Sequence, residues 1–168
     1  MASGDPVVQV VAIVPPGTDG ATIDFRVGGS TPPENFPVYD FDAAASEYID
    51  FLCKLEGYSG GGLTFTAPYM MSSAVANQVR LEIGIRRIQD DAEDVDTSHS
   101  YDFNGVSDTV PNVSGEASYP TIAFSNGADM DNWAEGELAM VRVYRDHDHA
   151  DDEATGDLEL LGLFGLET

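Results

Sequence analysis

Apolar and polar residues alternate along several stretches of the chain, most clearly between residues 57 and 88. A period of two residues is typical of strands in a sheet with one buried face and one wet face. We therefore expect strands over 63–71 and 79–88, joined by the loop 72–77, to form an antiparallel pair at the centre of the fold. The predicted inward residues are Leu63, Phe65, Ala67, Tyr69, Met71, Val79, Leu81, Ile83 and Ile85.

Similar patterns predict strands elsewhere, and no stretch has the period of a long helix. In 47–56 the inward positions include Cys53, the single cysteine, which we expect to be a buried small hydrophobe. Asn104 and Gly105 predict a bend, and 128–136 a short helical turn around Trp133. The remaining strands are expected over 7–14, 21–27, 37–42, 106–110, 118–125, 137–145 and 158–166. Eight to ten strands at this spacing predict an all-β fold, an antiparallel β-sandwich of jelly-roll type.

The pattern is interrupted near the N-terminus. Residues 28–33 read Gly-Gly-Ser-Thr-Pro-Pro, a composition that disfavours regular structure. We therefore expect residues 1–35 to form an N-terminal strand or arm, and residues 36–168 to form the jelly-roll domain. The start of the chain has no basic segment and no apolar run of about 18 residues, so neither a secretory signal nor membrane insertion is expected.

Charge narrows the classes of protein further. The 168 residues include 30 Asp and Glu against 7 Lys and Arg, with Lys54 the only lysine, for a net charge of −23. Because 42% of the residues are apolar and they alternate in strands, this charge belongs to the surface of a folded domain rather than to a disordered chain. Such a composition indicates a halophilic host. It also excludes nucleic acid as a partner, since phosphate contacts require basic clusters.

No motif in the chain has both the residues and the context for catalysis. Residues 57–61 match the G-x-S-x-G pattern around Ser59, but that elbow requires a helix after the serine, and a strand is expected there. A turn between strands is the better interpretation. With thirty acids, paired carboxylates arise by chance, so none is assigned to glycoside hydrolysis.

Two acidic segments carry residue types that could bind a metal ion. His147 and His149, with Asp148 and the acids 151–153, form a loop that suits a metal chemically but has no diagnostic spacing. Asp129 and Asp131 begin like a calcium loop, yet Trp133 stands where a third oxygen ligand is needed. We therefore assign no catalytic, cofactor-binding or metal residue. Asn112 lies in an N-x-S acceptor sequence.

From residue 36 onward, about three-quarters of the chain resembles small β-sandwich structural proteins encoded beside capsid genes in tailed viruses. The segments that carry the resemblance are 37–42, 58–64, 128–131, 136–138, 142–146 and 156–161. They are turn and strand motifs, so the resemblance implies a fold and a virion role without an active site. With the acidic composition it implies a capsid decoration or turret component, on the virion surface, of a tailed virus of a halophilic host. The major capsid protein or other virion proteins would then be its partners.

Two other classes stay open. A carbohydrate- or receptor-binding module of a viral spike or fibre would use exposed aromatic side chains, with Trp133 or tyrosines stacking on a host-surface glycan. An exposed aromatic platform favours that class, and a buried Trp133 counts against it. A hydrolase would place Ser59 within hydrogen-bond reach of a histidine.

The last expected strand suggests assembly. In 158–166 both faces are apolar, with Leu161 and Leu163 opposite Leu158 and Leu160. A strand of this kind requires cover on its second face. Either the segment 7–14 lies over it, or neighbouring copies cover it in a homotrimer.

The charge also yields a prediction. Because 23 uncompensated negative charges repel one another in dilute buffer, the melting temperature is expected to rise markedly between about 0.1 and 2 M KCl, where the screening length falls to a few Å. Thermal melts across that series measure it. A flat series would contradict the halophilic assignment.

Overall fold

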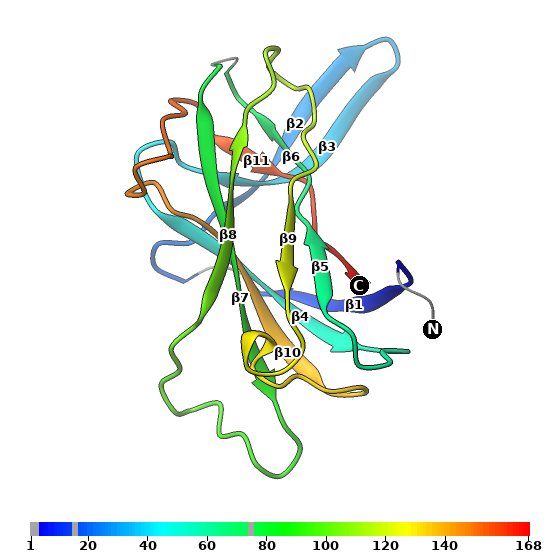
Figure 1. The fold of residues 1–168 in the computed structure, drawn as a ribbon. Coiled ribbons are helices and arrows are strands. Elements are labelled where there is room, and N and C mark those ends of the chain that lie inside the picture. Colours follow the sequence, from blue (N-terminus) through cyan, green and yellow to red (C-terminus); the bar gives the residue numbers. More distant parts are fainter. Residues whose placement is uncertain (1–3, 15–16, 74–75) are drawn as a thin grey trace.

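A computed structural model describes residues 4–14, 17–73 and 76–168 and shows twelve strands and one turn of 3-10 helix, η1 (Ala128–Met130) (Figure 1). The long strands are β1 (Pro6–Val14), β2 (Thr22–Ser30), β3 (Pro33–Phe41), β4 (Glu47–Leu55), β7 (Gln78–Ile88), β8 (Phe103–Thr109) and β10 (Leu138–Arg145). The short strands are β5 (Leu63–Thr66), β6 (Tyr69–Met71), β9 (Thr121–Phe124), β11 (Leu158–Leu160) and β12 (Phe164–Glu167). In this part of the chain no helix is long and apolar enough to cross a membrane.

The strands form two antiparallel sheets, which confirms the all-β sandwich. The large sheet has the order β8-β7-β10-β4-β1-β12-β5-β9, and the small sheet has the order β2-β3-β11-β6. The core lies between them, and the predicted inward residues of 63–71 and 79–85 are all buried there. So are Ile49, Phe51, Cys53 and Leu55 of β4. Burial raises the pKa of the Cys53 thiol to about 12, as expected of a buried hydrophobe.

Two of the expected strands are each divided between the sheets. Residues 63–71 form β5 in the large sheet and β6 in the small one, separated at Pro68, which has no N–H to donate to a ladder. Residues 158–166 divide in the same way into β11 and β12, on either side of Gly162 at φ 159. The two segments pass from one sheet to the other side by side. β5 pairs with β12 and β6 pairs with β11, and the Leu161 N–H donates to the Pro68 carbonyl at 2.8 Å.

This crossing corrects two expectations. The stretch 63–71 does not form a hairpin with 79–88, because β7 pairs with β8 and β10 instead. The apolar residues on both faces of 158–166 reflect in part a change of sheet: Leu158, Leu160 and Leu163 are buried within the chain's own core, whereas Phe164 is exposed. Together the two divisions turn ten expected strands into the twelve observed.

The N-terminal region also differs from the expected arm. β1 lies between β4 and β12 as an interior strand of the large sheet, beside β12 rather than over it. The expected boundary at residue 35 falls inside β3. Asn104 and Gly105, expected to bend, lie within β8 and pair with Ile83 and Glu82. In each case tertiary pairing overrides local turn propensity.

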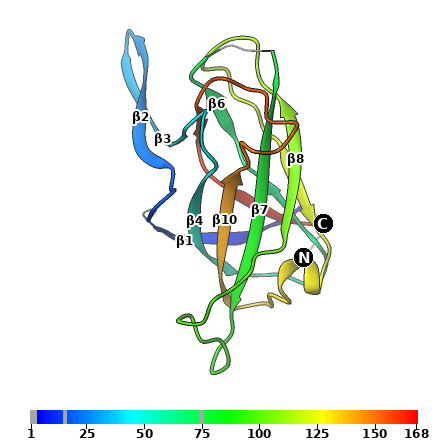
Figure 2. The ribbon, with the colours of Figure 1, turned by 90° about the vertical axis from the view of Figure 1, so that its left-hand side faces the viewer.

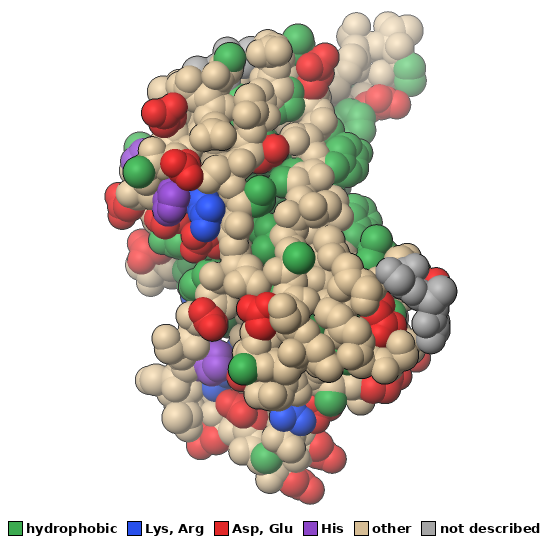
Figure 3. Space-filling model, in the orientation of Figure 1, with side chains coloured by type: hydrophobic (Ala, Val, Ile, Leu, Met, Phe, Trp, Pro, Cys, Tyr) green, Lys and Arg blue, Asp and Glu red, His purple; other side chains and the backbone are tan. Residues whose placement is uncertain are grey.

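The β2–β3 hairpin projects beyond the body of the sandwich (Figures 1 and 2). Its strands pair Ile23 with Tyr39 and Phe25 with Pro37, and Tyr39 packs edge-on against the core residue Phe51. Because paired residues share a face, Ile23, Phe25 and Val27 continue the inner face of the small sheet, yet they are 58%, 57% and 68% exposed. Hydrophobic side chains line this hollow flank of the molecule (Figure 3).

One inward position of the large sheet holds a cation. Arg145 follows Ala139, Val141 and Val143 on the buried face of β10 and is fully buried. Its Nε and Nη2 donate to the two carboxylate oxygens of Asp152 at 3.0 and 2.9 Å. The remaining donors reach the carbonyls of Ala154 (2.9 Å), Gly156 (3.0 Å) and Asp42 (3.4 Å). All five N–H groups are thus satisfied, and they hold the acidic loop 146–157 against the end of the sandwich.

We predict that Asp152→Ala lowers the free energy of unfolding by about 3–5 kcal/mol, because it leaves a buried guanidinium without its counter-charge. Urea unfolding in about 2 M KCl, which screens the surface charge, measures it. Asp151→Ala is the matched control: that side chain is 49% exposed, so a change within about 1 kcal/mol is expected. Equal losses in the two variants would contradict the role of the buried pair.

Candidate functional site

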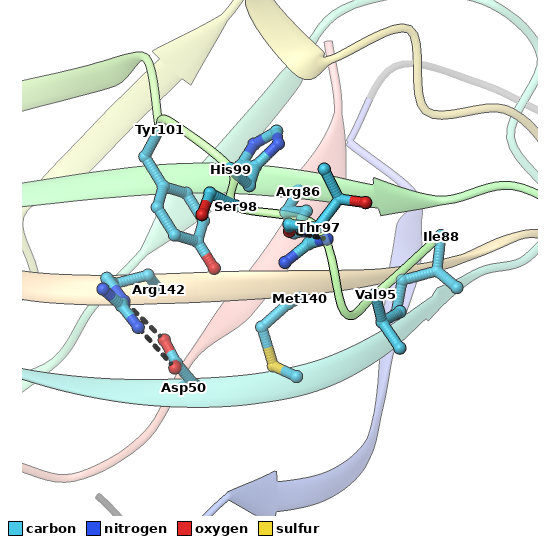
Figure 4. A pocket seen from close by; sticks show the side chains of 10 residues that line it. All are labelled: Asp50, Arg86, Ile88, Val95, Thr97, Ser98, His99, Tyr101, Met140 and Arg142. Atoms are coloured by element: carbon cyan, nitrogen blue, oxygen red, sulfur yellow. Dashed lines mark hydrogen bonds and ion pairs between the residues drawn. The ribbon is translucent and has the colours of Figure 1, made fainter. Parts of the chain in front are cut away.

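A cleft lies on the outer face of the large sheet, beneath the loop that joins β7 to β8 (Figure 4). Its volume is about 380 Å³. The floor comes from β4, β7 and β10, and the loop supplies one wall. The lining residues are Asp50, Arg86, Ile88, Val95, Thr97, Ser98, His99, Tyr101, Met140 and Arg142.

The register of the sheet places an ion pair at the centre of this floor. Asp50 lies directly opposite Arg142 across the β4–β10 ladder. The Arg142 Nε and Nη2 each donate to one Asp50 oxygen at 2.8 Å, and the side chains are only 24% and 13% exposed. The guanidinium also stacks over the ring of Tyr48 at 3.7 Å and that of Tyr101 at 4.8 Å. Bidentate pairing and stacking fix Arg142 in one position before any ligand arrives.

An aromatic row continues the site toward β8. The rings of His99, Tyr101, Phe103 and Tyr144 lie 5.2 to 5.6 Å apart in succession. Gly84, on the far side of Arg142, makes room for the row: a Cβ there would lie 2.8 Å from the Tyr101 ring and 2.9 Å from the Phe103 ring. Burial, followed by the Asp50 charge, raises the pKa of Tyr101, so its hydroxyl remains protonated and can donate or accept.

Arg86 completes the charged groups of the cleft. Its Nη2 donates to the carbonyls of Asp94 at 3.2 Å and Thr97 at 3.0 Å, which anchors the covering loop. Its Nε is buried and has no hydrogen-bond partner within the described chain. The cleft thus combines flat aromatic surface with fixed donors and acceptors.

Ser59 has a structural partner. Its hydroxyl donates to Glu167 Oε1 at 2.8 Å, and the backbone N–H groups of Ser59 and Gly61 donate to the same oxygen. The Gly61 N–H and the Ser59 hydroxyl hold the pKa of Glu167 below its ordinary value. The three histidines belong to the loops 89–102 and 146–157. The arrangement is a turn closed by a carboxylate between strands, the interpretation favoured over a nucleophile elbow.

The carboxylates considered as metal ligands each bind a different partner within the protein. Asp152 pairs with Arg145, while Asp151 accepts from Ser107 at 2.8 Å. Asp129 accepts from the Ser125 N–H at 2.5 Å, and Asp131 accepts from the Arg87 N–H at 2.9 Å. Across the described ranges, no three His, Cys, Asp or Glu side chains are grouped to hold a metal ion.

Trp133 follows the 3-10 turn η1, as expected for a helical turn in this segment. It is 1% exposed, and its indole N–H donates to the Glu137 carbonyl at 3.0 Å. A buried indole cannot stack on a sugar. Any aromatic platform for a glycan therefore lies elsewhere; the aromatic residues that line the cleft are His99 and Tyr101.

An acidic hollow of about 150 Å³ lies beside β3 and is lined by Thr22, Asp40, Asp42, Glu47 and Asp157. Burial, followed by the charges of Asp157 and Glu159, raises the pKa of Asp40 from 3.8 to about 6. Ionised Asp40 therefore weakens the fold at neutral pH. Between about pH 6 and pH 3.8 the folded protein binds the Asp40 proton more tightly than the unfolded chain does. The free energy of unfolding therefore increases as the pH falls through this range.

Comparison with known proteins gives no family. No family model and no curated protein matches the chain. Among solved structures, "Family 16 Carbohydrate Binding Module-2" is 10% identical with a TM-score of 0.42, over 78% of this chain and 77% of that one. TmCBM61, solved in complex with β-1,4-galactotriose, is 10% identical with a TM-score of 0.38, over 79% of this chain and 71% of that one. At these values neither match assigns a ligand to this chain.

Proposed function

We propose that the protein is a glycan-binding β-sandwich module and that the ligand occupies the cleft between the large sheet and the loop 89–102. The observation that carries the proposal is the fixed set formed by Asp50, Arg142 and Tyr101. It brings a bidentate ion pair on the floor and an aromatic ring from the loop together in one cleft.

The chemistry of this set suits a sugar. A pyranose presents an apolar C–H face and a rim of hydroxyls, so it requires a flat ring beside donors and acceptors in fixed directions. Tyr101 supplies the ring, while Asp50 and Arg142 supply acceptors and donors. Because Arg142 is already held by Asp50 and by Tyr48, little side-chain entropy is lost on binding.

The test is binding to a panel of neutral and acidic oligosaccharides, measured by calorimetry in about 2 M KCl so that surface charge is screened. For any ligand found, Tyr101→Ala is expected to weaken binding at least about tenfold, as loss of a central aromatic contact does. Tyr119→Ala is the control, because Tyr119 is exposed and lies outside the cleft. Equal losses in both variants, or no binding across the panel, would contradict the proposal.

The proposal assigns no catalytic residue: Ser59 bonds to Glu167, and Asp152 pairs with Arg145. A virion role, implied by the sequence resemblance, stays a prediction. A glycan-binding module of a spike or fibre is compatible with both.

A second observation favours association between copies. The β2–β3 hairpin exposes Ile23, Phe25 and Val27, while β1 exposes Val10 and Ile13. The last two lie opposite Cys53 and Phe51, so they share the inner face of the large sheet. Each chain thus offers a projecting apolar strip and an uncovered inner strip. We infer that the hairpin of one copy covers the β1 face of another, closing a homo-oligomer, with the homotrimer as the expected size.

Light scattering in about 2 M KCl is expected to give three times the chain mass of 18.0 kDa. Phe25→Asp should give a folded monomer, whereas Val95→Asp, an equally exposed position on the loop 89–102, should leave the oligomer intact. A monomeric parent protein at tens of micromolar would overturn this inference.

A further inference from the structure

We propose that the cleft selects an acidic glycan and that Arg86 receives the carboxylate of a uronic acid residue. The proposal rests on the glycan-binding function above and specifies its ligand class.

The distribution of charge sets Arg86 apart. The chain has seven Lys and Arg, and six of them form ion pairs with carboxylates: Arg26 with Glu159, Lys54 with Glu56, Arg80 with Glu82, Arg87 with Glu137, Arg142 with Asp50 and Arg145 with Asp152. The hydrogen bonds of Arg86 go to backbone carbonyls, and no carboxylate of the described residues forms an ion pair with it. In a protein with 30 acids, an arginine without an ion pair is unusual.

The geometry of Arg86 leaves room for a ligand. Nη2 is held by the two loop carbonyls, so the guanidinium plane is fixed. Nη1 has no hydrogen-bond partner among the residues that the structure describes, and Nε is buried there without one. Nη1 is therefore the donor that can meet a ligand. A charge-assisted bond from Nη1 to a carboxylate is stronger than a bond to a neutral hydroxyl.

The position within the cleft fits the same assignment. Arg86 and Met140 face each other across the β7–β10 ladder, one row from Arg142 and Gly84. A sugar ring on Tyr101 and Arg142 therefore has Arg86 beside it, on the same outer face (Figure 4). The floor of the cleft holds two arginines and one aspartate, while the loop 89–102 beside it carries six Asp and Glu and the whole chain carries −23. At molar salt the long-range repulsion of an anion is screened, while direct contact at Arg86 persists.

The experiment compares two related probes, tetragalacturonate and its full methyl ester, in which each charged carboxylate is replaced by a neutral methyl ester. Binding to the parent protein is measured by calorimetry in about 2 M KCl. The free acid is expected to bind at least about tenfold more tightly than the ester, as a charge-assisted contact does relative to a neutral one.

Arg86→Gln should reduce the ratio of the two affinities to about one, because the amide keeps hydrogen-bonding ability without charge. Arg87→Gln is the matched control: its side chain pairs with Glu137 outside the cleft, so the tenfold ratio should remain. A melt in the same buffer checks folding. If Arg86→Gln does not fold, Arg86→Lys, which keeps the charge, should still favour the acid, and the parent ratio stands as a test by itself.

The outcomes separate the two proposals. Equal binding of acid and ester, or of neutral glycans and the acid, overturns the selectivity and leaves the glycan-binding function standing. Absence of binding by every glycan overturns both. A preference for the acid that survives in Arg86→Gln overturns the assignment to Arg86.

Discussion

The buried ion pair between Arg145 and Asp152 is the constraint on which much of this fold depends. An inward position of a central strand is an expensive place for a charge, and it is tolerated because one carboxylate and three carbonyls surround it. Those partners come from the loop 146–157 and from Asp42, the residue that follows β3. A loop rich in acids, which in isolation would repel itself into solvent, is thereby given a fixed course between β10 in the large sheet and β11 in the small one.

Strand β10 has a second function on its other face. Val141, Val143 and Arg145 point inward, so Met140, Arg142 and Tyr144 point outward. The alternation that buries Arg145 therefore also presents Arg142 to the cleft. Antiparallel register then places Asp50, Arg142 and Gly84 in one row across three strands. Acceptor, donor and the space for an aromatic ring are therefore positioned by strand pairing, and the covering loop adds Tyr101.

Alternation in the sequence was sufficient to predict the sandwich, the buried face of β4 and β7, and the buried cysteine, because a period of two survives in any sheet. It could not predict that 63–71 and 158–166 each change sheet, since residues on both sides of Pro68 and Gly162 remain inward. The cleft was missed for a related reason. Asp50, Arg86, Tyr101 and Arg142 are far apart in the chain, and only the pairing of β4, β10 and β7 brings them together. One local signal was present: Gly84 interrupts the polar positions of β7, and it is there that the rings of Tyr101 and Phe103 approach.

Because β5–β6 and β11–β12 pass between the sheets side by side, the strand register of one sheet is tied to the strand register of the other. The two segments pair in one register in the large sheet and in a register shifted by one residue in the small sheet. The Leu161–Pro68 hydrogen bond lies where the register shifts. Because side chains alternate with a period of two, a single residue inserted on either side of that point would turn the whole of β6 or β11 inside out. A change in segment length in one sheet therefore alters the pairing in the other sheet as well. We expect sequences that adopt this fold to keep the number of residues around the crossing constant.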